Sequence, residues 1–160
     1  MNDGPRDEAP RIVVGVDGFE SSRAALRWAI HQAKLTGAVV EAVTAWQVPA
    51  GSRLIPAADL PDYQDDARII LTEAIAGTCM VDPEVEVRPH VVEGRAAQVL
   101  VDASEGADLL VVGSQGHGLA GALLGSVGRY CAHYAACPVV IMRGKPVTFG
   151  PGGARAGASR

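Results

Sequence analysis

The sequence predicts an α/β protein with one open, five-stranded parallel sheet, strand order 3-2-1-4-5, and helices on both faces. Three observations lead to this fold class. Segments with strand and helix patterns alternate along the chain, two strand segments are apolar on both faces, and one strand segment is half polar and contains a proline. Regular alternation of strands and helices is typical of a parallel sheet between two layers of helices.

Each element is supported by a local pattern. Short apolar or alternating runs predict strands at 11–17, 38–46, 84–92, 108–113 and 138–143. Apolar residues at helical spacing predict helices at 21–37, 62–78, 96–103 and 126–136, the first of them ending at Gly37. The stripes expected to face the sheet are Ala25, Leu26, Ala29, Ile30 and Ala33; Ala67, Ile70, Leu71, Ala74 and Ile75; Ala96, Val99, Leu100 and Ala103; and Val127, Tyr130, Cys131 and Tyr134.

The strand patterns also predict the strand order. IVVGV (12–16) and LLVV (109–112) are apolar on both faces, so these strands are expected at the centre of the sheet. EVEVRPHVV (84–92) contains Pro89 inside the run, which suits an edge strand. The order 3-2-1-4-5 satisfies these conditions and the rule of right-handed crossovers. Ligands of such sheets bind outside the carboxyl ends of the strands where the winding reverses, here between the first and fourth strands.

Length and composition narrow the class of protein. A chain of 160 residues favours one domain, expected at 11–143, with disordered ends at 1–10 and 144–160, of which the second is rich in glycine. A formal net charge of −4 argues against nucleic acid as the main partner. No apolar run reaches the roughly 18 residues of a membrane-spanning helix, so no membrane partner is expected.

Three cysteines, Cys79, Cys131 and Cys137, show neither a CxxC nor a metal-binding spacing. They are interpreted as small buried hydrophobic residues. The first residues, MNDGPRDEAPR, are polar and do not resemble a signal peptide. An odd number of cysteines in an unexported chain fits the reducing cytoplasm, which is the expected location.

A glycine-rich stretch, GSQGHGLAGALLGS (113–126), lies at the predicted crevice. Glycine permits positive φ and close approach of a ligand to the backbone. The first N–H groups of the helix that follows have no partner within the helix, and the helix dipole adds partial positive charge. The stretch therefore favours a phosphate site, to which Ser126 adds a hydroxyl and a possible N-cap. The alternative is a flexible connection between strand and helix, in which the glycines serve steric needs and bind no ligand.

Other motifs are weak. The chain has neither GxxxxGK[ST] nor, after the first strand, GxGxxG, so it lacks the phosphate loops of those two classes. His31, His90 and His133 are scattered, and His117 in the glycine stretch either touches phosphate or is solvated. Trp28 and Trp46 are interpreted as packing residues, and Asp65 with Asp66 as a solvated pair at a helix start. No catalytic or metal-binding residue is assigned.

The chain resembles the universal stress proteins of the ATP-binding type from Ile12 to Arg143. The resemblance is carried by VGVDG (14–18), SSRAALRWA (21–29), AWQ (45–47), VVEG (91–94), ASEGADLLVVGSQGHG (103–118), LLGSV (123–127) and CPVVIMR (137–143). The family signature is Gly, two residues, Gly, nine residues, Gly, then Ser or Thr. Gly113, Gly116 and Gly125-Ser126 match it, but eight residues, HGLAGALL, stand where the family has nine.

The resemblance implies a Rossmann-like fold of the adenine-nucleotide α-hydrolase type and ATP as the ligand, with Mg²⁺ as an optional companion ion. Asp17 would lie near the ribose or a metal-bound water, and Ala45 would offer backbone groups to adenine. For these two residues a turn former and a strand-packing residue are the alternatives. The residues implied to bind the nucleotide are Val16, Asp17, Ala45, Gly113, Gly116, His117, Gly125, Ser126, Val127 and Gly128.

Three functions are considered. The first is a regulatory protein that binds ATP, with AMP and ADP left open as ligands, and that forms a homodimer through 138–143, an apolar strand expected at a sheet edge. The second is a slow ATPase or nucleotidyl-transferring enzyme. Phosphoryl transfer usually needs a cationic side chain, and the glycine stretch has neither Lys nor Arg. A nucleotide-free interaction protein is the third possibility, because of the shortened stretch.

Overall fold

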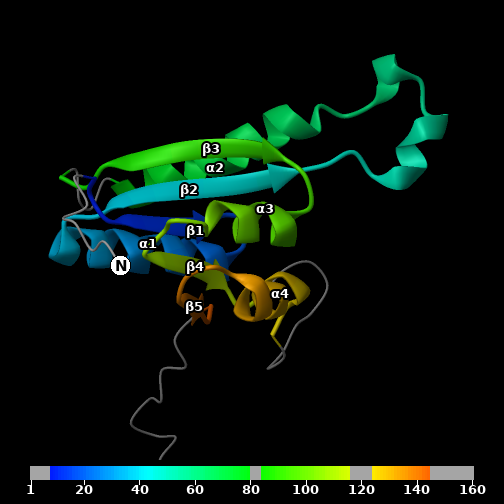
Figure 1. The fold of residues 1–160 in the computed structure, drawn as a ribbon. Helices are drawn as coiled ribbons and strands as arrows, with labels where there is room; N and C mark the ends of the chain where they lie inside the picture. Colours follow the sequence, from blue (N-terminus) through cyan, green and yellow to red (C-terminus); the bar gives the residue numbers. More distant parts are fainter. Residues whose placement is uncertain (1–7, 80–83, 116–123, 145–160) are drawn as a thin grey trace, which may run out of the picture.

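Five parallel strands form one sheet in the order β3-β2-β1-β4-β5, which confirms the predicted topology (Figure 1). The computed structural model describes residues 8–79, 84–115 and 124–144. The strands are β1 (Arg11–Gly15), β2 (Val39–Trp46), β3 (Val87–Glu93), β4 (Leu109–Gly113) and β5 (Val139–Met142). The helices are α1 (Glu20–Thr36), α2 (Tyr63–Cys79), α3 (Ala96–Ala103) and α4 (Ser126–Tyr134). Most of the two ends predicted to be disordered lies outside the described residues.

Helices cover both faces of the sheet. In Figure 1, α1 and α2 lie behind the sheet and α3 and α4 lie in front of it. Val14 packs with Leu26 and Leu71 on the first face, whereas Val13 packs with Leu100 and Cys131 on the second. Val13 and Val14 are both fully buried, because adjacent residues of a strand point to opposite faces. The two apolar faces of the central strand β1 are thus both explained by core packing.

The predicted stripe of α1 is confirmed, and that of α4 is wrong in part. All five apolar residues of the α1 stripe are buried, and the helix ends at Gly37, whose φ of 70° is left-handed. In α4 only Cys131 of the predicted stripe is buried, while Tyr134 is 64% exposed. The helix contacts the short edge strand β5 and α3, so the sheet covers only a narrow stripe of its surface. The ring of Tyr134 instead packs on that of Tyr130, with centroids 4.6 Å apart.

Cys131 behaves as the predicted core residue. Its side chain is fully buried, and this burial raises the pKa of the thiol from 9.0 to about 11. The thiol is therefore protonated at neutral pH and packs as a small apolar group.

The proline inside β3 lies on the open edge of the sheet. The N–H of Val40 donates to the Glu86 carbonyl, and the N–H of Gly94 donates to the Trp46 carbonyl. The backbone groups of even-numbered β3 residues therefore face β2, and those of odd-numbered residues face outward. Pro89 is odd-numbered, so its missing N–H costs no ladder hydrogen bond, and the predicted edge position is confirmed.

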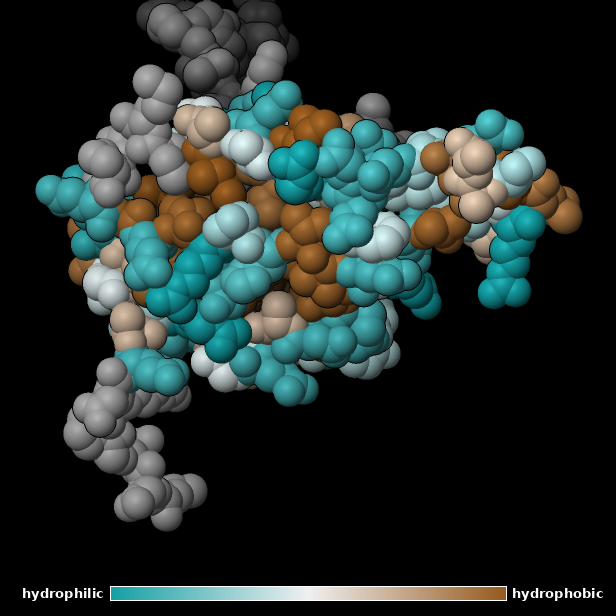
Figure 2. Space-filling model, turned by 90° about the horizontal axis from the view of Figure 1, so that it is seen from above, coloured by the Kyte–Doolittle hydropathy of each residue, from teal (hydrophilic) through white to brown (hydrophobic). Residues whose placement is uncertain are grey.

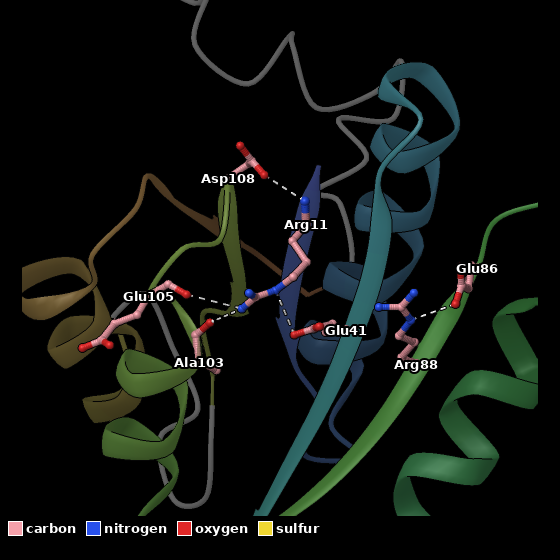
Figure 3. A network of polar contacts seen from close by, with 7 residues as sticks. All are labelled: Arg11, Glu41, Glu86, Arg88, Ala103, Glu105 and Asp108. Atoms are coloured by element: carbon pink, nitrogen blue, oxygen red, sulfur yellow. Dashed lines mark hydrogen bonds and ion pairs between the residues drawn. The ribbon is translucent and has the colours of Figure 1, made fainter. Parts of the chain in front are cut away.

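Polar residues join the amino-terminal ends of the central strands (Figure 3). The backbone N–H of Arg11 donates to Asp108 Oδ2 at 2.8 Å, and Arg11 Nη2 donates to the Ala103 carbonyl at 2.9 Å. Arg11 Nε lies 3.1 Å from Glu41 Oε2, an ion pair without hydrogen-bond alignment. These contacts connect β1 to β2 and to the α3–β4 connection, at the end of the sheet opposite to the predicted crevice.

An arm of residues 47–62 projects from the carboxyl end of β2 (Figure 1; right side of Figure 2). It contains two short 3₁₀ helices, Ala50–Leu54 and Ala57–Asp59, each directly after a proline. Leu54 within the arm is 94% exposed. The chain returns from this arm at Tyr63, where α2 begins. In the described parts of the chain, no helix is long and apolar enough to span a membrane.

Candidate functional site

A cavity of about 550 Å³ opens outside the carboxyl ends of β1, β2 and β4, where the sequence predicts the crevice. Its size lies within the ~300–1,000 Å³ that is usual for small-molecule sites. The strand ends form its floor. Its walls come from the first two turns of α2, from the first turn of α4, from Ser22 of α1, and from Ala96 and Leu100 of α3.

Every predicted site residue that the structure describes lines this cavity. These residues are Val16, Asp17, Ala45, Gly113, Gly125, Ser126, Val127 and Gly128. Gly116 and His117 lie outside the described residues. The structure thus brings together residues from three strand ends and one helix start, and their binding of a nucleotide stays a prediction.

The Asp17 side chain makes a local turn at the end of β1. Its Oδ1 accepts a hydrogen bond from the Phe19 N–H at 3.0 Å, and Gly18 has a φ of 85°. The turn-forming role that the sequence left open is therefore realised. A carboxylate can accept several hydrogen bonds, so the turn leaves capacity for a ligand.

Gly113 has a packing role that the sequence analysis missed. A Cβ atom at this position would lie 2.5 Å from Ser21 Oγ and 2.8 Å from the backbone N of Ser22. Ser21 is buried, and its hydroxyl donates to the Gln115 carbonyl at 3.2 Å. The start of α1 therefore packs directly on the end of β4, and only glycine fits between them.

The predicted N-cap role of Ser126 is wrong. Gly125 is the N-cap of α4, with φ −61° and ψ 162°, and no side chain caps the helix. The N–H of Gly125 donates to the Ser114 carbonyl at 2.9 Å, which holds Gly125 in an extended conformation beside β4. Ser126 is therefore the first residue of the helix and not its N-cap. The N–H groups of Ser126, Val127 and Gly128 lie in the first turn and have no partner within the helix.

Among the lining residues that the structure describes, the only charged ones are Asp17 and Asp66. Arg129 lies just beyond the wall, and its Nη2 donates to the Leu124 carbonyl at 3.4 Å. Within the described ranges no group of three or more His, Cys, Asp or Glu side chains could hold a metal ion. Positive potential at the α4 end must therefore come mainly from backbone N–H groups and the helix dipole.

The wall opposite α4 contains residues that the sequence analysis assigned to other roles. Trp46, interpreted as a packing residue, lines the cavity together with Gln47, Tyr63 and Ile70. Asp66 is exposed to solvent, as the sequence predicts, and it also lines the cavity. Trp46 is the last residue of the predicted strand 38–46 and Gln47 directly follows it, which is a signal that could have identified them. Tyr63 and Asp66 gave no such signal, because the whole arm separates them from β2.

The fold and the position of the cavity define a Rossmann-like α/β protein of the adenine-nucleotide α-hydrolase type. The model of the universal stress protein family matches residues 9–143. Universal stress protein Rv2005c of Mycobacterium tuberculosis is 38% identical over 140 residues, which are 87% of this chain and 47% of that protein. A universal stress protein of Mycolicibacterium smegmatis is 34% identical over 83% of this chain and 48% of its own length. The chain belongs to the universal stress protein family, and it spans about half the length of these curated relatives.

Solved structures of the family have the same fold. A universal stress protein crystallised in complex with cAMP is 29% identical, with a TM-score of 0.66 over 85% of this chain and 98% of that one. Universal stress protein UspA from Lactobacillus plantarum also has a TM-score of 0.66, over 86% of this chain and all of that one. Its identity of 20% makes it evidence for the fold alone.

Proposed function

We propose that this protein binds an adenine nucleotide, with ATP and Mg²⁺ as the preferred ligand. It acts in the cytoplasm as a regulatory protein, whose effect on other processes depends on whether nucleotide is bound. The observation that carries the proposal is the cavity at the β1/β4 switch point, which the first turn of α4 borders. The similarity to a solved universal stress protein in complex with cAMP supports the same class of ligand.

The cavity suggests an orientation for the nucleotide. Free N–H groups at a helix start favour anions, so the phosphates belong beside Ser126, Val127 and Gly128. The sugar then lies over the end of β1 near Asp17, and the base reaches the end of β2 at Ala45. Mg²⁺, when bound, would neutralise phosphate charge, and Asp17 is the lining carboxylate nearer to the phosphates.

Binding is a better proposal than catalysis. Rapid phosphoryl transfer needs a positioned nucleophile and strong neutralisation of charge. No Lys or Arg lines the described part of the cavity. We therefore expect any ATP hydrolysis to be far slower than the roughly 1–100 s⁻¹ of kinases. The shortened HGLAGALL segment keeps a nucleotide-free interaction protein as the alternative.

We propose further that the protein forms a homodimer through residues 138–143. β5 is an edge strand, and its four residues, VVIM, are each half-buried in the single chain. An apolar edge invites pairing, and a two-fold axis closes such a contact. Sedimentation should give twice the mass of the chain. Val140→Lys should yield a monomer or insoluble protein, whereas an unchanged dimer would place the interface elsewhere.

The nucleotide proposal is tested with freshly purified protein. The protein is heat-denatured, and any released nucleotide is identified by chromatography. Calorimetric titration of emptied protein with MgATP, AMP and cAMP then gives affinities. Binding of at least one of these supports the proposal. Absence of binding in all three titrations rejects it and favours the interaction protein.

A further inference from the structure

The cavity has a second polar wall, formed by Trp46 and Gln47 at the end of β2 and by Tyr63 and Asp66 in the first turn of α2. We refer to these four residues as the α2 wall. α2 packs on β2 and β3, whereas α4 packs on β5 and α3. In Figure 1, α2 and α4 accordingly lie toward opposite edges of the sheet. A nucleotide with its phosphates at α4 therefore directs its base toward the α2 wall.

Asp66 is the anionic residue of the α2 wall, and its carboxylate has no hydrogen bond or ion pair with any described residue. Its neighbour Asp65 differs in this respect, because the Asp65 carboxylate accepts a hydrogen bond from Arg68 Nε at 3.0 Å. Both carboxylates lie in the first turn of α2, where the helix dipole favours either one equally. The dipole therefore does not explain why an unpaired carboxylate lines the cavity.

The chemistry of a carboxylate makes it selective. An ionised carboxylate only accepts hydrogen bonds. Adenine presents an amino group at position 6, which donates, whereas guanine and hypoxanthine present a carbonyl oxygen there, which accepts. A carboxylate beside position 6 thus attracts the first kind of base and repels the second, and repulsion of the wrong ligand is an effective source of specificity.

We propose that Asp66 determines the base specificity of the cavity by accepting a hydrogen bond from the 6-amino group of the purine. This assignment rests on the proposed nucleotide function. It gives the two lining carboxylates separate roles. Asp17 lies at the end of β1 with one oxygen bound to the Phe19 N–H, and Asp66 lies at the base end.

AMP and IMP are suitable probes, because they have the same sugar and phosphate and differ only at position 6 of the base and at the adjacent N1, which carries a proton in IMP. Calorimetric titrations of the full chain, Asp66→Asn and Asp65→Asn give the ratio of the AMP and IMP affinities for each protein. We expect the parent to prefer AMP by about tenfold or more, as for a hydrogen bond to a charged group. Asp66→Asn should bring the ratio close to one, because an amide can donate to the carbonyl of IMP. Asp65→Asn, the matched control, should keep the parental ratio.

The outcomes separate this assignment from the proposed function. A parent that binds neither nucleotide rejects both. A parent that binds AMP but does not distinguish IMP overturns the assignment alone, and so does an Asp66→Asn variant that retains the parental preference. Asp66 is exposed to solvent, so the variant should fold, and circular dichroism checks this. Asp66→Ala provides a second variant, which should lose AMP affinity and should gain less IMP affinity than Asp66→Asn, because it removes the repulsion but supplies no donor for the carbonyl.

Discussion

Polar groups gather at both ends of the parallel sheet, but their pairing differs. At the amino-terminal ends of the strands, the Arg11 guanidinium pairs with the Glu41 carboxylate, and its Nη2 and backbone N–H donate to the Ala103 carbonyl and to Asp108 (Figure 3). Its charge and these two donors have partners within the fold, whereas Nε makes no aligned hydrogen bond with a described residue. At the carboxyl ends, the first-turn N–H groups of α4 have no partner within their helix, and the Asp66 carboxylate has none among the described residues. A polar group paired within the fold stabilises it, whereas an unpaired group that lines a cavity is available to a ligand.

The largest expected effect concerns the packing of Gly113 at the carboxyl end of the sheet. Gly113→Ala should lower the free energy of unfolding by about 1–3 kcal/mol or more, because the new Cβ meets the backbone of α1. Gly77→Ala is the matched control. Nothing lies within 4 Å of a Cβ at this exposed position of α2, so the same change should stabilise the helix by roughly 0.5–1 kcal/mol. Urea denaturation measures both. Equal effects of the two substitutions would refute the packing role of Gly113.

The second prediction tests the amino-terminal end. Arg11→Met should lower the free energy of unfolding by about 1–3 kcal/mol, because the largely buried Glu41 carboxylate loses its partner. Nucleotide affinity should stay at the parental value. Arg88→Met, which removes an exposed ion pair with Glu86, should cost much less. Denaturation and calorimetry on the same samples check this. A loss of affinity in Arg11→Met would mean that the two ends of the sheet are not independent.

The smallest expected effect concerns Ser126. Since Gly125 is the N-cap, Ser126→Ala should leave the free energy of unfolding within about 0.5 kcal/mol of the parent. The affinity for MgATP should fall by about 0.5–1.5 kcal/mol, as for one lost hydrogen bond. Titration and urea denaturation give the two quantities. A stability loss of about 1 kcal/mol, typical of a lost N-cap, would restore the capping role that the sequence suggested.

The sequence alone determined the fold class, the strand order and the general place of the site. Apolar faces on both sides of 12–16 and 109–112, and Pro89 within 84–92, were enough to order the sheet, because burial on one or two faces leaves a local pattern. The stripe of α1 and its end at Gly37 were predicted for the same reason. The site residues that the resemblance implied, where the structure describes them, line one cavity.

Only the tertiary structure decided the remaining features, since they depend on contacts between distant segments. No side chain fits at position 113, because Ser21, far away in the sequence, occupies the space that a Cβ would need. Gly125 replaces Ser126 as the N-cap because its N–H pairs with the Ser114 carbonyl across the glycine stretch. The sequence predicts a solvated side chain for Asp66, because its neighbours in the sequence are polar. Asp66 lines the cavity because the arm turns back to the sheet at Tyr63. The local pattern predicts that a helix begins there, but it does not predict where a long loop places that helix in space.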